Sequence, residues 1–97
     1  MIEGKKYDAG KSRMALLPPR ALKEVARVLT YGAQKYDEHN WKKLENLEPR
    51  YMDALLRHVF DYLSGEELDE ESGLSHLAHA VCCLLFVLED KLENASS

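Results

Sequence analysis

Apolar residues recur at intervals of three and four positions along most of this 97-residue chain, which is the spacing of helices that bury one face. Three stretches show this spacing, and they predict helices at about residues 19–36, 50–64 and 74–92. β-Branched residues are few, and no stretch alternates apolar and polar residues over the length of a strand. The pattern therefore predicts an all-α fold, a small bundle of three main helices in one domain that spans residues 1–97.

Prolines and a glycine mark where these helices begin and where one is weakened. Pro18-Pro19 is expected to open the first helix and Pro49 the second, because the first helical turn does not use the N–H that proline lacks. Gly32 interrupts the first helix at a cost of about 1 kcal/mol relative to alanine, which close approach of another helix or of a ligand would offset. Residues 1–17 are expected to form an N-terminal arm, and residues 90–97 a polar tail.

The third predicted helix is apolar almost all round from Leu77 to Leu88, so it must be buried. A single core in a chain of this size covers only about two-thirds of the unfolded surface, and the sequence therefore predicts a homodimer or a higher homo-oligomer. The apolar run is too short to cross a bilayer, and no charged leader with an apolar segment opens the chain. We expect a cytoplasmic protein with no membrane partner. The adjacent Cys82 and Cys83 are expected to be small buried thiols.

The net charge of −4 conceals a difference between the two halves of the chain. Residues 1–50 hold eleven Lys and Arg against seven Asp and Glu, hence +4, whereas residues 51–97 hold two against ten, hence −8. The first half is suited to phosphate and the second to metal ions. A nucleic-acid binder more often presents a continuous basic face and a high pI, so no stable nucleic-acid complex is expected.

Ionisable residues gather around the junction of the second and third predicted helices. Asp53, Arg57 and Asp61 recur every fourth residue with His58 beside them, five carboxylates occupy positions 66–71, and two histidines open the third helix one turn apart. Each group also has a purely structural explanation. The residues spaced every fourth position could form intrahelical ion pairs, the carboxylates at 66–71 could be a solvated acidic turn, and the two histidines could be hydrogen-bonded core residues. A helical hairpin would nevertheless bring all three groups to one end of the bundle, which favours a divalent-cation site.

Oxygen-rich sites with few histidines suit Mg²⁺ or Mn²⁺, and these ions are commonly shared with substrate phosphates. Lys11, Lys35 and Arg57 supply cations for such phosphates, although Gly10-Lys11-Ser12 lacks the first glycine and the strand of a phosphate loop. Trp41 beside Asn40 suits a nucleobase, with a ring to stack and an amide to read its edge, or else simply pins a loop to the core. A metal-bound nucleotide is therefore the expected ligand.

Several short motifs in the chain together resemble those of the phage-encoded dATP/dGTP diphosphohydrolase family, from about Tyr7 to Glu89. The motifs are Tyr7-Asp8-x-Gly10-Lys11, Leu16-Leu17-Pro18-Pro19, Tyr31-Gly32-Ala33-x-Lys35-Tyr36, Asn40-Trp41, Ala54-Leu55-x-Arg57-His58, Gly65-Glu66-x-x-Asp69-x-x-Ser72-Gly73-Leu74 and His76-Leu77-Ala78-His79-Ala80. The resemblance implies a relation to the all-helical MazG-like nucleoside triphosphate pyrophosphatases. Those enzymes are oligomers that use Mg²⁺ or Mn²⁺ to convert a triphosphate to a monophosphate and pyrophosphate.

The resemblance also implies roles for individual residues. The expected sets are Arg57, His58 and Asp61 for catalysis, Glu66, Asp69, His76 and His79 for metal, and Lys11, Lys35, Asn40, Trp41 and Arg57 for substrate. Glu70 and Glu71 lie outside the motif and are expected to be bystanders. The Glu-Glu-x-x-Glu and Glu-x-x-Asp helices of MazG-like enzymes are absent, and His76-x-x-His79 stands where the second would fall.

The function that follows is metal-dependent hydrolysis of a purine deoxynucleoside triphosphate, dGTP or dATP, to the monophosphate and pyrophosphate. Such an enzyme would serve phage nucleotide-pool remodelling. The competing reading is a non-catalytic helical module that binds a nucleotide or a protein, in which the acidic turn meets a basic partner and the histidines are structural.

Overall fold

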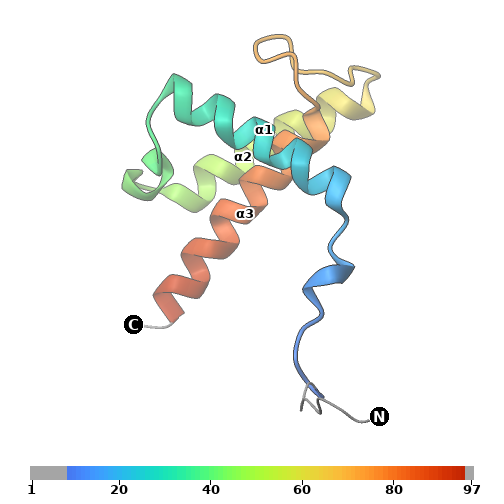
Figure 1. Cartoon of the computed structure of the whole chain (residues 1–97). Coiled ribbons are helices and arrows are strands. Elements are labelled where there is room, and N and C mark those ends of the chain that lie inside the picture. Colours follow the sequence, from blue (N-terminus) through green and yellow to red (C-terminus); the bar gives the residue numbers. More distant parts are fainter. Residues whose placement is uncertain (1–8, 96–97) are drawn as a thin grey trace.

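The structure is a computed structural model that describes residues 9–95, and in this part of the chain it is helical, as the periodicity predicts (Figure 1). The three main helices are α1 (Pro19–Lys35), α2 (Leu47–Leu63) and α3 (His76–Ala95). Two short 3₁₀ turns accompany them, η1 (Met14–Leu16) and η2 (Asn40–Lys43). Within residues 9–95 the only strand-like pairing is an isolated bridge between Leu68 and Ser75. The predicted all-α, three-helix fold is confirmed.

The helices are arranged as an antiparallel hairpin of α2 and α3, with α1 lying across it (Figure 1). The core sits where α1 crosses α3. It consists of Val25, Val28, Leu74, Ala78 and Cys82, with Tyr31 and Phe86 packed at its edge. Because this core is small, it positions α1 against α3 but leaves much of the hairpin uncovered.

The observed helix limits correct two expectations. α2 begins at Leu47, three residues earlier than predicted, because Asn46 takes a left-handed conformation (φ 56°) and Leu47 is buried. Pro49 still falls in the first turn, where its missing N–H costs nothing. α3 begins at His76 rather than 74, since the Ser75 hydroxyl accepts hydrogen bonds from the first turn, at 3.1 Å from Leu77 N and 3.3 Å from Ala78 N.

The polar tail expected at residues 90–97 is wrong as far as Ala95, because α3 continues to that residue. Two ion pairs hold this last stretch against the rest of the molecule. Lys91 Nζ lies 2.8 Å from Glu48 Oε1 at the start of α2, and Lys42 Nζ in η2 lies 3.9 Å from Glu93 Oε2. Polar residues that pair along a neighbouring helix sustain a helix that an apolar stripe alone does not predict.

The two cysteines are buried free thiols, as expected. Cys82 Sγ lies 3.6 Å from the backbone carbonyl of Val25, to which it donates. Burial raises the pKa of Cys82 to about 12 and that of Cys83 to about 11. Both side chains therefore behave as small apolar groups rather than as nucleophiles.

One face of the hairpin remains apolar and exposed. It comprises Leu56, Phe60 and Leu63 on α2 and Leu77, Val81, Leu84 and Leu88 on α3, and we call it the hairpin face. Leu88 is 54% exposed and Leu77 and Leu84 are each 48% exposed, so the burial expected of the stretch from Leu77 to Leu88 is not reached within one chain. No helix in the part of the chain that the structure describes is both long and apolar enough to span a bilayer.

Gly32 illustrates how the fold leaves room around α1. A Cβ at this position would meet nothing within 4 Å, so no neighbouring helix requires a glycine there. Instead Gly32 lines the principal cavity of the molecule. Of the two explanations for this glycine, close approach of another helix does not apply within the described chain, and close approach of a ligand remains.

Gly32→Ala should stabilise the chain by about 0.5–1 kcal/mol, because alanine is the better helix former and its methyl group meets no atom. The matched variant Gly73→Ala should destabilise it, because Gly73 has φ 72°, where a side chain is strained. Urea unfolding followed by circular dichroism measures both. A Gly32→Ala protein less stable than wild type would contradict the open space described here.

Candidate metal and nucleotide site

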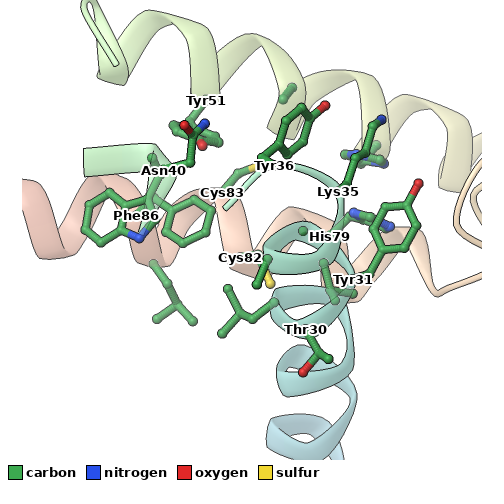
Figure 2. Close-up of a pocket in the computed structure, with 18 of the residues that line it drawn as sticks. Thr30, Tyr31, Lys35, Tyr36, Asn40, Tyr51, His79, Cys82, Cys83 and Phe86 are labelled. Carbon is green, nitrogen blue, oxygen red and sulfur yellow. The ribbon is translucent and has the colours of Figure 1, made fainter. Parts of the chain in front are cut away.

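A cavity of about 980 Å³ opens between the three helices and the segment that joins α1 to α2 (Figure 2). Its lining changes character from one end to the other. Ionisable residues lie at one end: Lys35, Arg57, His58, Asp61, Asp69, Glu71 and His79. Aromatic and amide side chains lie at the other, namely Asn40, Trp41, Tyr51 and Phe86, and Tyr36 lies between the two ends beside Lys35 (Figure 2).

His76 is the most deeply buried side chain of the described residues, at 1% exposure, and both of its ring nitrogens have partners. Nε2 lies 3.1 Å from Glu66 Oε1, and Nδ1 lies 2.8 Å from His58 Nδ1. The backbone N–H of His76 donates to the carbonyl of Glu67 over 2.9 Å. The first residue of α3 therefore ties together the end of α2 and the acidic loop.

The acidic loop, residues 64–75, is a folded structure rather than a solvated turn. Its backbone closes on itself through Asp69 N to Leu74 O at 2.8 Å and Gly73 N to Asp69 O at 2.7 Å. The Asp69 carboxylate accepts the backbone N–H of Ser72 over 2.8 Å. These bonds turn Asp69 toward the cavity and the histidines. The alternative that the loop is simply a solvated acidic turn therefore does not apply to Asp69.

His79 supports His58 and is itself held by the loop. Its ring stacks on that of His58, with 4.5 Å between centroids and 10° between planes. Its Nε2 lies 2.7 Å from Ser72 Oγ and 4.0 Å from Asp69 Oδ2. Because Ser72 Oγ also accepts the N–H of Leu74, its hydroxyl proton is available to His79.

The surroundings of these groups shift their pKa values. Burial lowers the pKa of His58 and of His79 below 6.5. Asp69 opposes this lowering of the pKa at both residues, whereas His76 adds to it. For Asp69, burial raises the pKa, but its contacts with Ser72, above all the hydrogen bond from the backbone N–H, and the neighbouring His79 and His58 outweigh burial and leave the pKa lowered. Near neutral pH His58 and His79 are thus uncharged beside an ionised Asp69, and neutral imidazoles and carboxylates are the forms that bind a metal ion.

Two overlapping groups of side chains have metal-binding geometry. His58, Asp69 and His76 offer three ligand atoms within 4.8 Å of one another, and so do Asp61, Glu66 and His76. The donors fit a divalent cation, since imidazole nitrogens and carboxylate oxygens converge on one point beside the cavity.

Lys35 and Glu71 form an ion pair at the mouth of the cavity, which links α1 to the acidic loop. The pair raises the pKa of Lys35 and lowers that of Glu71, and the neighbouring Tyr31 lowers the pKa of Glu71 further. Glu71, which the sequence predicts to be a bystander, is thus paired with a residue that lines the cavity. The pair fixes the position of Lys35 at the edge of the cavity.

At the aromatic end, Trp41 stacks on Phe86 with 4.9 Å between centroids and 18° between planes. Tyr51 packs against the same Phe86 ring at 4.9 Å and 58°. One face of the Trp41 ring therefore packs against α3 and holds η2 in place. Its remaining surface lines the cavity together with Asn40 and the 64%-exposed Tyr36.

The structure brings most of the sequence-predicted site residues together. Those that line the cavity are Lys35, Asn40, Trp41, Arg57, His58, Asp61, Asp69 and His79. His76 and Glu66 lie behind them, in contact with His58 through His76. Lys11 does not line the cavity, and residues 9–17, the described part of the N-terminal arm, run from α1 away from the bundle (Figure 1).

Within the described residues, the structure differs from the sequence-based expectations in two ion pairs that do not form and in two lining residues that were not predicted. The intrahelical ion pairs offered for Asp53, Arg57 and Asp61 are not formed within 4.0 Å in the described chain. Sequence reasoning missed Tyr51 and Phe86 as lining residues, because an apolar ring on a helical stripe looks the same whether it faces a core or a cavity. Tyr36 also lines the cavity without having been in the predicted sets, and its place in the motif Tyr31-Gly32-Ala33-x-Lys35-Tyr36 was the sequence signal that could have identified it.

The lowered histidine pKa values predict how stability depends on pH. Below about pH 6.5 the unfolded chain takes up protons that folded His58 and His79 resist, so the unfolding free energy should be full above that pH and fall as the pH drops through it. We expect a lower Tm at pH 5.5 than at pH 7.5 in EDTA, with a smaller difference in His79→Gln. His39→Asn, at an exposed left-handed position, is the control that should keep the wild-type difference. A Tm that does not fall would contradict this.

Comparison with known proteins agrees with the motifs. The family model described as "dATP/dGTP diphosphohydrolase, N-terminal" matches residues 1–96. A protein of Salmonella phage PMBT28 named dATP/dGTP diphosphohydrolase is 45% identical over 86 residues, which cover 89% of this chain and 29% of that relative. The chain thus spans less than a third of the curated relative that it matches. No solved structure matches it. The family model and the phage relative together show that the chain belongs to the dATP/dGTP diphosphohydrolase family, in its N-terminal region.

Proposed function

We propose that this chain hydrolyses a purine deoxynucleoside triphosphate, dGTP or dATP, to the monophosphate and pyrophosphate with the help of Mg²⁺ or Mn²⁺. The observation that carries the proposal is the division of one cavity into an aromatic end and a histidine and carboxylate end. The name of the phage relative supports the substrate class, and the same relative motivates a role in phage nucleotide-pool remodelling.

The spacing of the two ends suits a nucleoside triphosphate. On α3, His79 and Phe86 are seven residues apart, and on α2, Tyr51 and His58 are also seven residues apart. A helix rises 1.5 Å per residue, so each pair is separated by about 10 Å along its axis. With the base at the aromatic end, the phosphates reach the histidines and Asp69.

The side chains around the cavity have complementary roles in this reaction. Lys35 and Arg57 supply positive charge to the phosphate chain, and Asn40 supplies an amide for the edge of the base. Asp61 lies at the ionisable end, where its carboxylate would accept a proton from water. A divalent ion, held by the histidines and carboxylates of the cluster, would supply positive charge that stabilises the transition state. Water attacks the α-phosphorus, the bond to the bridging oxygen breaks, and pyrophosphate leaves.

Incubation of the 97-residue chain with each deoxynucleoside triphosphate and Mn²⁺ or Mg²⁺ tests the proposal. We expect a purine nucleotide to yield monophosphate and pyrophosphate, and EDTA to stop the reaction. Asp69→Asn should lose at least about tenfold in turnover, roughly 1.4 kcal/mol of transition-state stabilisation. Glu70→Gln, an exposed neighbour that does not line the cavity, is the matched control and should be close to wild type.

The competing function is a non-catalytic helical module that binds a nucleotide or a protein. Absence of turnover with every nucleotide and both metals, in a folded protein, would favour it. Equal losses in Asp69→Asn and Glu70→Gln would show that the loop acts through its total negative charge, which would contradict the role of Asp69 given above.

We also propose that the hairpin face is covered by a second copy of the chain. A continuous apolar surface from two helices is the kind that homodimers bury, and four such helices would complete a bundle. Light scattering should give a mass of at least twice 11.1 kDa at micromolar concentration. Phe60→Glu should shift it toward the monomer, whereas Leu16→Glu, exposed on η1 outside the face, should not. A monomeric wild-type protein would contradict this proposal.

A further inference from the structure

The three histidines of the cluster differ in what their nitrogens face, and this difference separates metal ligands from supporting residues. His76 decides the matter because it belongs to both candidate groups of ligands. A neutral imidazole has one nitrogen with a hydrogen and one with a lone pair, so His76 can serve only one of the two groups at a time.

The partner of Nε2 determines which nitrogen of His76 carries the hydrogen. An ionised carboxylate only accepts hydrogen bonds, and Glu66 Oε1 lies 3.1 Å from Nε2. Nε2 therefore carries the hydrogen and donates it to Glu66. The lone pair is left on Nδ1, which faces His58 Nδ1 at 2.8 Å.

The position of the cavity points to the same side of the ring. His58 and Asp69 line the cavity, whereas Glu66 is not among the described residues that line it. An ion shared with a ligand in the cavity is consequently within reach of the Nδ1 side of His76. Glu66 occupies the place of the carboxylate that orients a metal-binding histidine from behind.

The facing nitrogens are also spaced as a pair of metal ligands would be. Two nitrogens that bind one ion at about 2.1 Å each, with bonds at right angles, lie about 3 Å apart. His58 Nδ1 and His76 Nδ1 are 2.8 Å apart, close to that spacing. In the metal-free chain His58 Nδ1 donates its hydrogen to His76 Nδ1, so an ion enters when the hydrogen of His58 moves to its Nε2 and both Nδ1 lone pairs become available. His79 stacks flat on His58 and, with its Nε2 held by Ser72, fixes the orientation of the His58 ring.

We infer that His58, His76 and Asp69 form a two-histidine, one-carboxylate centre for a divalent transition ion, with Glu66 and His79 as positioning residues. Imidazole nitrogens suit Mn²⁺, Co²⁺ and Zn²⁺, whereas Mg²⁺ prefers oxygen ligands. The centre therefore selects a transition ion over Mg²⁺. Its catalytic use rests on the proposed function, but its metal binding does not.

Titration of the metal-free chain with Co²⁺, Mn²⁺ and Mg²⁺ in the absence of nucleotide tests this assignment. Visible absorption reports nitrogen ligation of Co²⁺, and calorimetry gives the affinity of each ion. We expect Co²⁺ and Mn²⁺ to bind at least about tenfold more tightly than Mg²⁺. His58→Gln and Asp69→Asn should abolish the Co²⁺ bands, and circular dichroism should confirm that both variants are folded.

Two further variants separate the competing groups of ligands. Glu66→Gln should weaken Co²⁺ binding by roughly ten- to a hundredfold while retaining the bands of a nitrogen-ligated ion. Asp61→Asn should leave the bands and the affinity near those of wild type. Loss of the bands in Asp61→Asn but not in His58→Gln would overturn the assignment in favour of the group of Asp61, Glu66 and His76.

The failure of this inference is distinguishable from that of the proposed function. Equal affinity for Mg²⁺ and Mn²⁺, or no Co²⁺ bands at all, would overturn the transition-ion centre even if the chain hydrolyses nucleotides. Conversely, a Co²⁺ centre that requires His58 supports the inference even in a chain that turns over no nucleotide.

Discussion

The hydrogen bonds of one buried side chain, His76, connect the parts of the molecule that make the site. Burying an imidazole is unfavourable unless both nitrogens find partners, and here the partners come from the end of α2 and from the acidic loop. Glu66 and His58 are ten and eighteen residues away in sequence. The start of α3, the direction of the loop and the orientation of His58 all follow from satisfying this one group.

The acidic loop brings like charges together, and the fold offsets their repulsion in different ways. Asp69 is held by N–H donors and faces imidazoles, Glu71 pairs with Lys35, and Glu66 accepts a hydrogen from His76. Each of these carboxylates thus has a partner from a different element. The loop consequently joins α1 to the hairpin at the mouth of the cavity, and it supplies negative charge there without being a disordered acidic stretch.

The two ends of the cavity depend on the same pair of helices. α2 and α3 carry an ionisable group near the loop and an aromatic group two turns away, and α1 closes the side with Lys35 and Tyr36. The opposite side of the hairpin holds exposed Leu, Val and Phe side chains. A chain this short cannot cover both sides of a two-helix layer with one further helix, so α1 covers the side of the cavity and the other side stays exposed.

The helical period, the prolines and the motifs determined the number of helices, their order and most of the site residues, because these depend on local spacing and short-range sequence. They also placed the histidines and carboxylates together at one end of the hairpin. Only the tertiary structure decided which nitrogen of His76 faces His58, that Glu71 pairs with Lys35, and that Trp41 rests on Phe86. Those outcomes depend on the rotation of each helix about its axis and on the backbone bonds of residues 64–75, to which a periodic pattern is insensitive.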